Sequence, residues 1–163
     1  MIEGRDNNYI QSLANDARVA RLATIDFEEA KPHIVPVVFV FDGEAYYIPI
    51  DKKPKTDPKR LRRIRNIQKN PSVALLIDEY DDDWSKLFFV MIQGKGSLIG
   101  EFVENDNLVD KKRNSCKSRC LLKNAQRLLL EKYPQYQKIS MGQLCIMIWP
   151  EKVFTWTMSG HIR

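Results

Sequence analysis

The sequence predicts a mainly β fold, a six-stranded antiparallel β-barrel with a few flanking helices. Most apolar runs are short, rich in Val, Ile, Phe and Tyr, and bounded by turn residues, as in strands joined by hairpins. Only three segments carry the spacing of an amphipathic helix. A chain of 163 residues is long enough to bury a core, so we expect one domain over residues 1–163.

The N-terminal segment, residues 1–17, is expected to form a short helix with Ile10 and Leu13 facing inward. Residues 2–5 read IEGR, the recognition sequence of a protease used to cleave fusion tags, and we assign them no function. The alternating pattern RVARLATI then predicts the first strand at residues 18–25.

Two β-rich runs follow, at residues 33–41 and 46–50, and each contains a proline, Pro36 and Pro49. Proline has no backbone N–H, which confines it to edge strands and bulges. The backbone at both places is therefore not fully used in the sheet, and another molecule has room to approach it.

The most charged segment comes next. Residues 52–69 hold nine Lys or Arg and one acid, Asp57, in a chain of net charge +5, so the basicity is local. We expect a helix with Asp57 as its N-cap and Pro58 at the first position. Its buried stripe comprises Leu61, Ile64 and Ile67, and its outward-facing cations are Lys59, Arg62, Arg63 and Arg65.

The second half of the chain alternates strands with one further helix. Strands are expected at residues 72–78 and 87–100, the latter with glycines at Gly94 and Gly96, and as a final pair at 144–150 and 152–158. The helix covers residues 120–136, and its inner face comprises Leu121, Leu122, Ala125, Leu128 and Leu129. The acidic loop of Asp81, Asp82 and Asp83 is expected to lie away from the basic helix.

Cysteine and histidine usage points to an intracellular protein without a metal site. The three cysteines, Cys116, Cys120 and Cys145, form no disulfide framework, and no second ligand pair completes a zinc site with Cys116 and Cys120. We interpret His33 as a strand-start residue and His161 as solvated. The chain has no signal-peptide pattern and no apolar run of membrane-spanning length, so we expect a cytoplasmic protein without a membrane partner.

The order of these segments resembles the pyridoxamine 5′-phosphate oxidase-like, FMN-binding split-barrel family. The resemblance covers residues 18–156 and rests on RVARLATID, KPHIVPVVFVFDGEAYYIPI, RLRRIRNIQKNPSVALLID, DDDWS and GKGSLI. Within the family the chain is most similar to the branch of probable oxidoreductases that use the deazaflavin coenzyme factor 420, with KYPQY as a further shared feature. The resemblance implies a homodimer with two cofactors at the subunit interface. It also implies hydride transfer between the cofactor and a small organic substrate, without a catalytic side chain.

The same resemblance implies a phosphate site on the basic helix. The family binds the cofactor phosphate with a Lys or Arg shortly before the sequence RN(L/I), which here is Arg63 with Arg62 beside it. Lys55 and Lys59 are candidates to assist. FMN and the deazaflavin share the ring and the first phosphate, so both stay open, although the long basic loop favours the more anionic deazaflavin.

The ring is expected to lie against two strands and to bind backbone groups. The resemblance places its contacts at Val35, Pro36, Val37, Ile48, Pro49 and Ile50. Trp84 matches a family position near the interface and is expected to point toward the partner's cofactor, although a Trp that anchors the loop or core fits the sequence too.

Two other classes of function stay open. The basic helix could serve a nucleic-acid-binding module, but no aromatic residues interleave with its cations and no nucleic-acid motif accompanies it, so we expect no such partner. A split barrel that binds flavin or haem without turnover is the other alternative. True pyridoxamine-phosphate oxidase activity is disfavoured, because the C-terminal Arg and His pattern is not found beyond SGHIR. The substrate and the direction of the redox reaction stay open.

Overall fold

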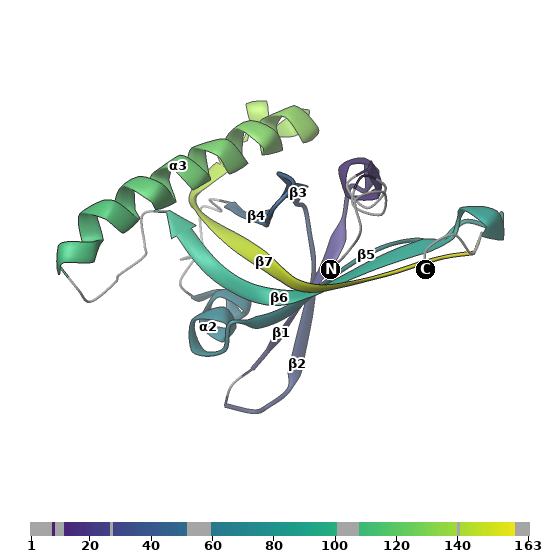
Figure 1. The fold of residues 1–163 in the computed structure, drawn as a ribbon, viewed down its shortest axis with the longest axis horizontal. Coiled ribbons are helices and arrows are strands. Elements are labelled where there is room, and N and C mark those ends of the chain that lie inside the picture. Colours follow the sequence, from purple (N-terminus) through teal and green to yellow (C-terminus); the bar gives the residue numbers. More distant parts are fainter. Residues whose placement is uncertain are drawn as a thin grey trace.

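The computed structural model describes residues 8, 12–26, 28–51, 60–100, 108–139 and 141–158, with the side chains of the long helix described from residue 118. Figure 1 shows the elements, and their order along the chain is β1 (Ala20–Ile25), β2 (Pro32–Val37), β3 (Val40–Phe41), β4 (Tyr46–Asp51), α2 (Arg62–Lys69), β5 (Ser72–Glu79), η2 (Trp84–Lys86), β6 (Phe88–Gly100), α3 (Leu108–Lys132), η3 (Pro134–Gln137) and β7 (Met141–Thr157).

The strands form one antiparallel sheet in the order β2-β1-β5-β6-β7-β4-β3. The mainly β, antiparallel fold expected from the sequence is therefore confirmed. Long, curved β6 and β7 run side by side through its centre, with α3 and α2 on opposite sides of them (Figure 1). Within the described residues, the edge strand β2 and the strands β3 and β4 at the other end do not pair with each other.

The sheet has seven strands, as many as the runs assigned to strands from the sequence and one more than the expected six-stranded barrel, but two of these assignments differ from the structure. The run at residues 33–41 is two strands, β2 and β3, because the chain leaves the sheet at Val38 and Phe39 and Phe39 enters the core. The expected final pair is instead one continuous strand, β7. Pro150 is accommodated within it at a register shift opposite Gly94, where an added Cβ would lie 2.1 Å from the Trp149 carbonyl oxygen.

Pro36 and Pro49 both lie where the sheet does not need a backbone N–H donor. Pro36 lies on the edge strand β2. On β4, only Tyr46 and Tyr47 pair with β3, so Pro49 lies past the end of that pairing. It also lies next to a register shift between Pro49 and Asp51 in the pairing with β7. Both segments therefore carry backbone that the sheet does not fully use, as the sequence predicts.

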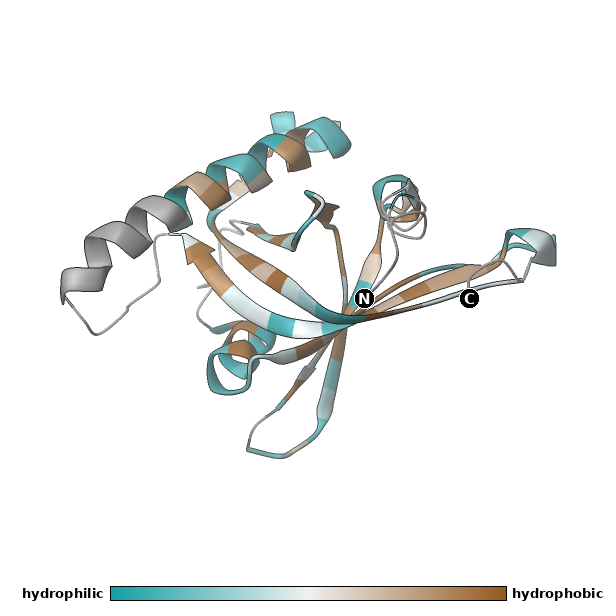
Figure 2. Ribbon diagram, viewed as in Figure 1, coloured by the Kyte–Doolittle hydropathy of each residue, from teal (hydrophilic) through white to brown (hydrophobic). Residues whose placement is uncertain are grey.

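Two apolar clusters hold the fold together (Figure 2). The first lies on one face of the sheet, with Leu22, Ile48, Leu75, Ile92 and Ile148 among its members. The second packs α3 on the other face of β3, β4 and β7, through Leu122, Ala125 and Leu129, with Leu121 and Leu128 partly buried. The expected inner face of α3 is thus confirmed, although the helix begins at Leu108, well before residue 120.

Helix α2 is shorter than expected. Leu61 has extended backbone angles and stands as the N-cap, so the helix begins at Arg62 and has no side-chain cap; the expected Asp57 and Pro58 lie outside the described residues. Ile64 and Ile67 are buried and Leu61 is partly buried, which confirms the predicted stripe. Gly96 lets the helix approach β6, because a Cβ there would lie 3.3 Å from Ile67 Cγ2.

Residues 12–16 are helical, and Leu13 packs against the first apolar cluster, whereas Ile10 lies outside the described residues. None of the helices in the described ranges has the length and apolar content needed to cross a membrane.

Candidate functional site

Polar contacts along its whole length fix α2 over the β1–β2 hairpin. Asn66 Nδ2 donates a hydrogen bond of 2.9 Å to Thr24 Oγ1, and both residues are buried. Arg62 Nε lies 3.7 Å from Asp26 Oδ2 in the hairpin turn, and Lys69 pairs with Glu28 there. The helix is therefore held beside the β1–β2 hairpin, whose outer strand β2 pairs only with β1 among the described residues.

Arg63 lies at this edge and is half-buried, which corrects the expectation that it faces fully outward. Its Nε atom is buried and has no hydrogen-bond partner among the described residues. Burial lowers the pKa of Arg63, and the nearby Asp51 carboxylate opposes that effect. Because an arginine stays protonated in proteins, Arg63 is a partly buried cation that lacks a close partner for one donor.

His33 lies at the same place. It stands opposite Thr24 in the β1–β2 ladder, and the Thr24 hydroxyl is 3.4 Å from its carbonyl oxygen. Its Nδ1 atom is buried without a partner, and burial together with Arg62 and Arg63 lowers its pKa. In the described part of the chain, His33 Nδ1 and Arg63 Nε are the two buried side-chain polar atoms without a hydrogen bond, and they flank one site.

The sequence interpretation of His33 as a strand-start residue is confirmed, since it is the second residue of β2, but that interpretation did not predict the burial of its Nδ1 atom. The signal that could have found it is the alternation of β2: His33, Val35 and Val37 share the inward face, where a polar residue is unusual.

Asp51 ends β4 on the other side of Arg63. Its Oδ1 accepts a hydrogen bond of 2.9 Å from the hydroxyl of Tyr136 in η3, which fixes the carboxylate. Burial raises the pKa of Tyr136, and the hydrogen bond to Asp51 raises it further. The candidate site thus joins α2, β2 and the end of β4.

These residues fit an anion such as a phosphate. A helix N-terminus without a side-chain cap has backbone N–H groups and a partial positive charge that favour anions. Arg63 supplies a half-buried guanidinium with a spare donor, and Arg62 lies next to it on the first turn. Lys55 and Lys59, expected to assist, lie outside the described residues.

The six residues expected to contact the ring differ in how buried they are. Ile48 and Ile50 are 1% exposed and belong to the core, so only their backbone could meet a ligand. Val37 is buried and Val35 is partly buried on the same face of β2, whereas Pro36 is exposed. Pro49 is buried on the other face of β4.

Trp84 is 58% exposed and belongs to no core of its own chain. It lies in η2, at the opposite end of β5 from α2 (Figure 1). The eight residues of β5 span about 26 Å, which separates Trp84 from α2. Asp81 and Asp83 pair there with Lys86. The acidic loop therefore lies away from Arg63, as expected, and Trp84 cannot reach Arg63 of the same chain.

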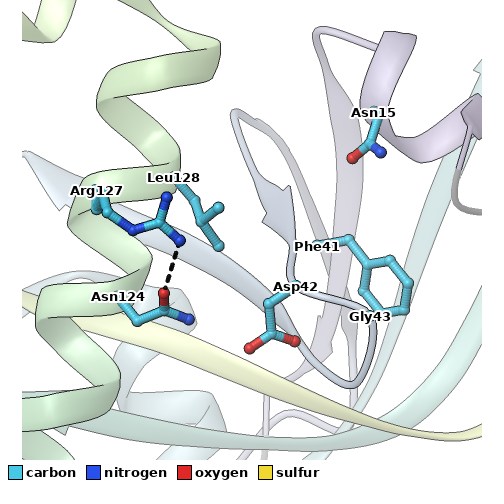
Figure 3. A pocket seen from close by; sticks show the side chains of 7 residues that line it. All are labelled: Asn15, Phe41, Asp42, Gly43, Asn124, Arg127 and Leu128. Carbon is cyan, nitrogen blue, oxygen red and sulfur yellow. Dashed lines mark hydrogen bonds between the residues drawn. The ribbon is translucent and has the colours of Figure 1, made fainter.

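A surface cavity of about 410 Å³ lies elsewhere, between residues 12–16, the β3–β4 turn and α3 (Figure 3). None of the predicted site residues lines it. Its two charged side chains are already paired: Arg127 donates to Asn124 and Glu131, and Asp42 accepts hydrogen bonds from the Tyr47 hydroxyl and two backbone N–H groups.

Among the described residues, no group of three His, Cys, Asp or Glu side chains could hold a metal ion. Cys120 is an exposed free thiol, and Cys145 is buried, with its Sγ 3.1 Å from the Ile48 carbonyl oxygen. His161 and the side chain of Cys116 lie outside the described residues.

Comparison with known proteins agrees with this fold. The chain is similar to a proposed pyridoxamine 5′-phosphate oxidase from Listeria innocua, with 20% identity, a TM-score of 0.59 and coverage of 91% of this chain and 96% of the other. The haem-storage protein HutZ of Vibrio cholerae shares 17% identity, with a TM-score of 0.54 and 92% of each chain covered. An FAD-binding protein from Mesorhizobium loti also shares 17% identity, with a TM-score of 0.52 and 88% of each chain covered.

These identities are low, so the structural matches support the fold alone. A search of curated protein sequences found no match. The family model for pyridoxamine 5′-phosphate oxidase, however, matches residues 8–155, nearly the whole chain. The chain therefore belongs to the pyridoxamine 5′-phosphate oxidase family.

Proposed function

We propose that this protein is an oxidoreductase that binds a flavin-type cofactor, the deazaflavin factor 420 or FMN, and acts on a small organic substrate. The observation that carries the proposal is the pair of buried, unpartnered nitrogens of Arg63 and His33 beside the uncapped start of α2. A buried polar group without a partner is costly, and a phosphate would supply the missing acceptor.

In this proposal, Arg63 binds the cofactor phosphate, and Arg62, Lys59 and Lys55 add positive charge around it. The backbone of Val35, Pro36 and Val37 on β2, and of Ile48, Pro49 and Ile50 on β4, lines the ring. When bound, the cofactor supplies the hydride chemistry, and the protein positions it and excludes water. No side chain is assigned a proton-transfer role.

We also propose a homodimer, in the cytoplasm, with Trp84 packed against the partner's cofactor. Helix α3 covers the outer face of the sheet over β3, β4, the beginning of β7 and the end of β6, where Ile99 lies. The rest of that face carries cross-strand neighbours with apolar side chains, notably Leu76, Met91, Phe154, Phe89 and Trp156. Figure 2 shows hydrophobic residues along the strands that run toward η2. A second copy would cover this face.

The nucleic-acid alternative is weakened by the placement of the cations. Arg62 and Lys69 of α2 are paired with Asp26 and Glu28, and Arg63 is half-buried. A binding face for a polyanion needs several free, exposed cations side by side.

A non-catalytic flavin- or haem-binding barrel is the remaining alternative, since one protein of similar fold stores haem. The test is to titrate the purified protein separately with FMN, the deazaflavin and haemin, and to record absorbance and fluorescence. We expect saturable binding of FMN or the deazaflavin, followed by enzyme-dependent reoxidation of the reduced cofactor by organic acceptors. Binding of haemin alone, or of duplex DNA, would overturn the proposal.

A further inference from the structure

His33 is directed into the fold by its strand. On β2 it shares the inward face with Val35 and Val37, and in the ladder it stands opposite Thr24, which is 2% exposed. Thr24 accepts the hydrogen bond from Asn66, and Asn66 lies one helical turn after Arg63. The imidazole of His33 thus lies near α2, close enough for the charges of Arg62 and Arg63 to act on it.

The surroundings of the imidazole are positively charged. From α2, Arg62 and Arg63 face it, and from the β1–β2 turn Asp26 faces it, while its neighbours Thr24 and Asn66 are neutral. Asp26 is already engaged, because its Oδ1 accepts the backbone N–H groups of Glu28 and Glu29 and its Oδ2 lies 3.7 Å from Arg62 Nε. No described group accepts a hydrogen bond from His33 Nδ1.

We infer that His33 is a direct ligand of the anion bound by Arg63, to which its Nδ1–H donates, and that binding of this anion takes up a proton. The inference rests on the proposed phosphate site and adds to it a third donor and a dependence on pH. Two arginines, a helix N-terminus and an imidazolium would surround the phosphate from α2 and β2 together.

The direction of the pH dependence follows from the charges. Without the anion, burial and the two arginines hold the pKa of His33 below its ordinary value, so the imidazole is neutral at pH 7. A phosphate dianion beside it favours the charged form and raises its pKa. Between the two pKa values binding takes up a proton, so the affinity for the anion falls as the pH rises through this window. Each unit of pKa difference changes the affinity about tenfold across the window.

The test is a fluorescence titration of the full chain with FMN and with riboflavin from pH 5.5 to 8.5. The variants are His33→Gln, which keeps a neutral donor, and His161→Gln as the matched control. We expect the preference for FMN over riboflavin to fall about tenfold between pH 6 and 8 in the wild type and the control, and by less than about twofold in His33→Gln. Ionisation of the FMN phosphate itself is common to all three proteins and cancels in this comparison.

A second measurement keeps the inference testable if His33→Gln does not fold. The imidazole of His33 is titrated by NMR in the wild type with and without FMN, and FMN is expected to raise its pKa. If FMN leaves that titration unchanged, or if His33→Gln keeps the wild-type pH dependence, the inference is wrong while the phosphate site at Arg63 stands. If the wild type shows no preference for FMN at any pH, the proposed function itself fails.

Discussion

Lys132, at the end of α3, connects the N-terminal segment to the barrel. Its Nζ donates a hydrogen bond of 2.7 Å to the Ala14 carbonyl oxygen and lies 4.2 Å from the centre of the Phe39 ring. Beside it, the Arg18 guanidinium stacks 4.5 Å from the centre of the Tyr133 ring. Burial, with a smaller contribution from Arg18, lowers the pKa of Lys132 to about 8.

This shift predicts how stability depends on pH. In the unfolded chain Lys132 keeps its proton to a pH of about 10.4, whereas the folded chain releases it near a pKa of about 8. Between these values the unfolded state binds more protons, so the contribution of Lys132 to stability rises with pH. We expect the melting temperature of the wild type to increase relative to Lys132→Met between pH 8 and 10. A difference that is constant with pH in thermal unfolding would contradict this assignment.

At the level of the secondary-structure elements, Asn66 fixes α2 on β1. It is 4% exposed, and its bond to Thr24 is a buried polar contact between the helix and β1. We expect Asn66→Ala to leave the Thr24 hydroxyl without its donor and to destabilise the fold by about 1–3 kcal/mol. Urea unfolding measures this free energy. Gln68→Ala, on the exposed face of the same helix, is the matched control and should change stability little.

The elements themselves were largely predictable, and their ends were not. Alternation identified β1, a short apolar run identified β5, and the three-residue spacing identified the buried face of α2. Local patterns could not show that Leu61 is extended or that α3 continues back to Leu108, because helix ends depend on tertiary packing and capping.

The candidate site was predictable only in part for the same reason. The resemblance singled out Arg63 as a cation on the helix, but its half-burial depends on β2 and the end of β4, which are distant in the sequence. His33 could not be joined to Arg63 until the β1–β2 ladder and the Asn66 contact brought the two segments together.

For the whole molecule, the uncovered sheet face predicts the mode of assembly. Phe154 and Trp156 are each 43% exposed on β7, Trp156 stacks on Phe89, and Arg21 pairs with Asp78 on the same face. We expect the double variant Phe154→Lys and Trp156→Lys to weaken dimerisation about a hundredfold or more, because it removes two large apolar contacts and places like charges together. Sedimentation measures the change.

The control for that experiment is Ile139→Lys, which replaces an apolar side chain that is 54% exposed after η3. It should assemble as the wild type does. A wild type that is monomeric at micromolar concentration, or a double variant that remains dimeric, would show that this face does not join two copies.

In the proposed function Arg63 holds the phosphate of a flavin-type cofactor, and the difference between FMN and riboflavin binding measures that contact. Both ligands are titrated against the wild type, Arg63→Ala and Arg65→Ala, an exposed cation on the same helix. A hydrogen bond to a charged group contributes about 1.5–3 kcal/mol, so the account predicts that Arg63→Ala weakens FMN binding about tenfold or more. Riboflavin binding should be unchanged in all three proteins, and Arg65→Ala should match the wild type. Equal affinity of the wild type and Arg63→Ala for FMN would contradict the account.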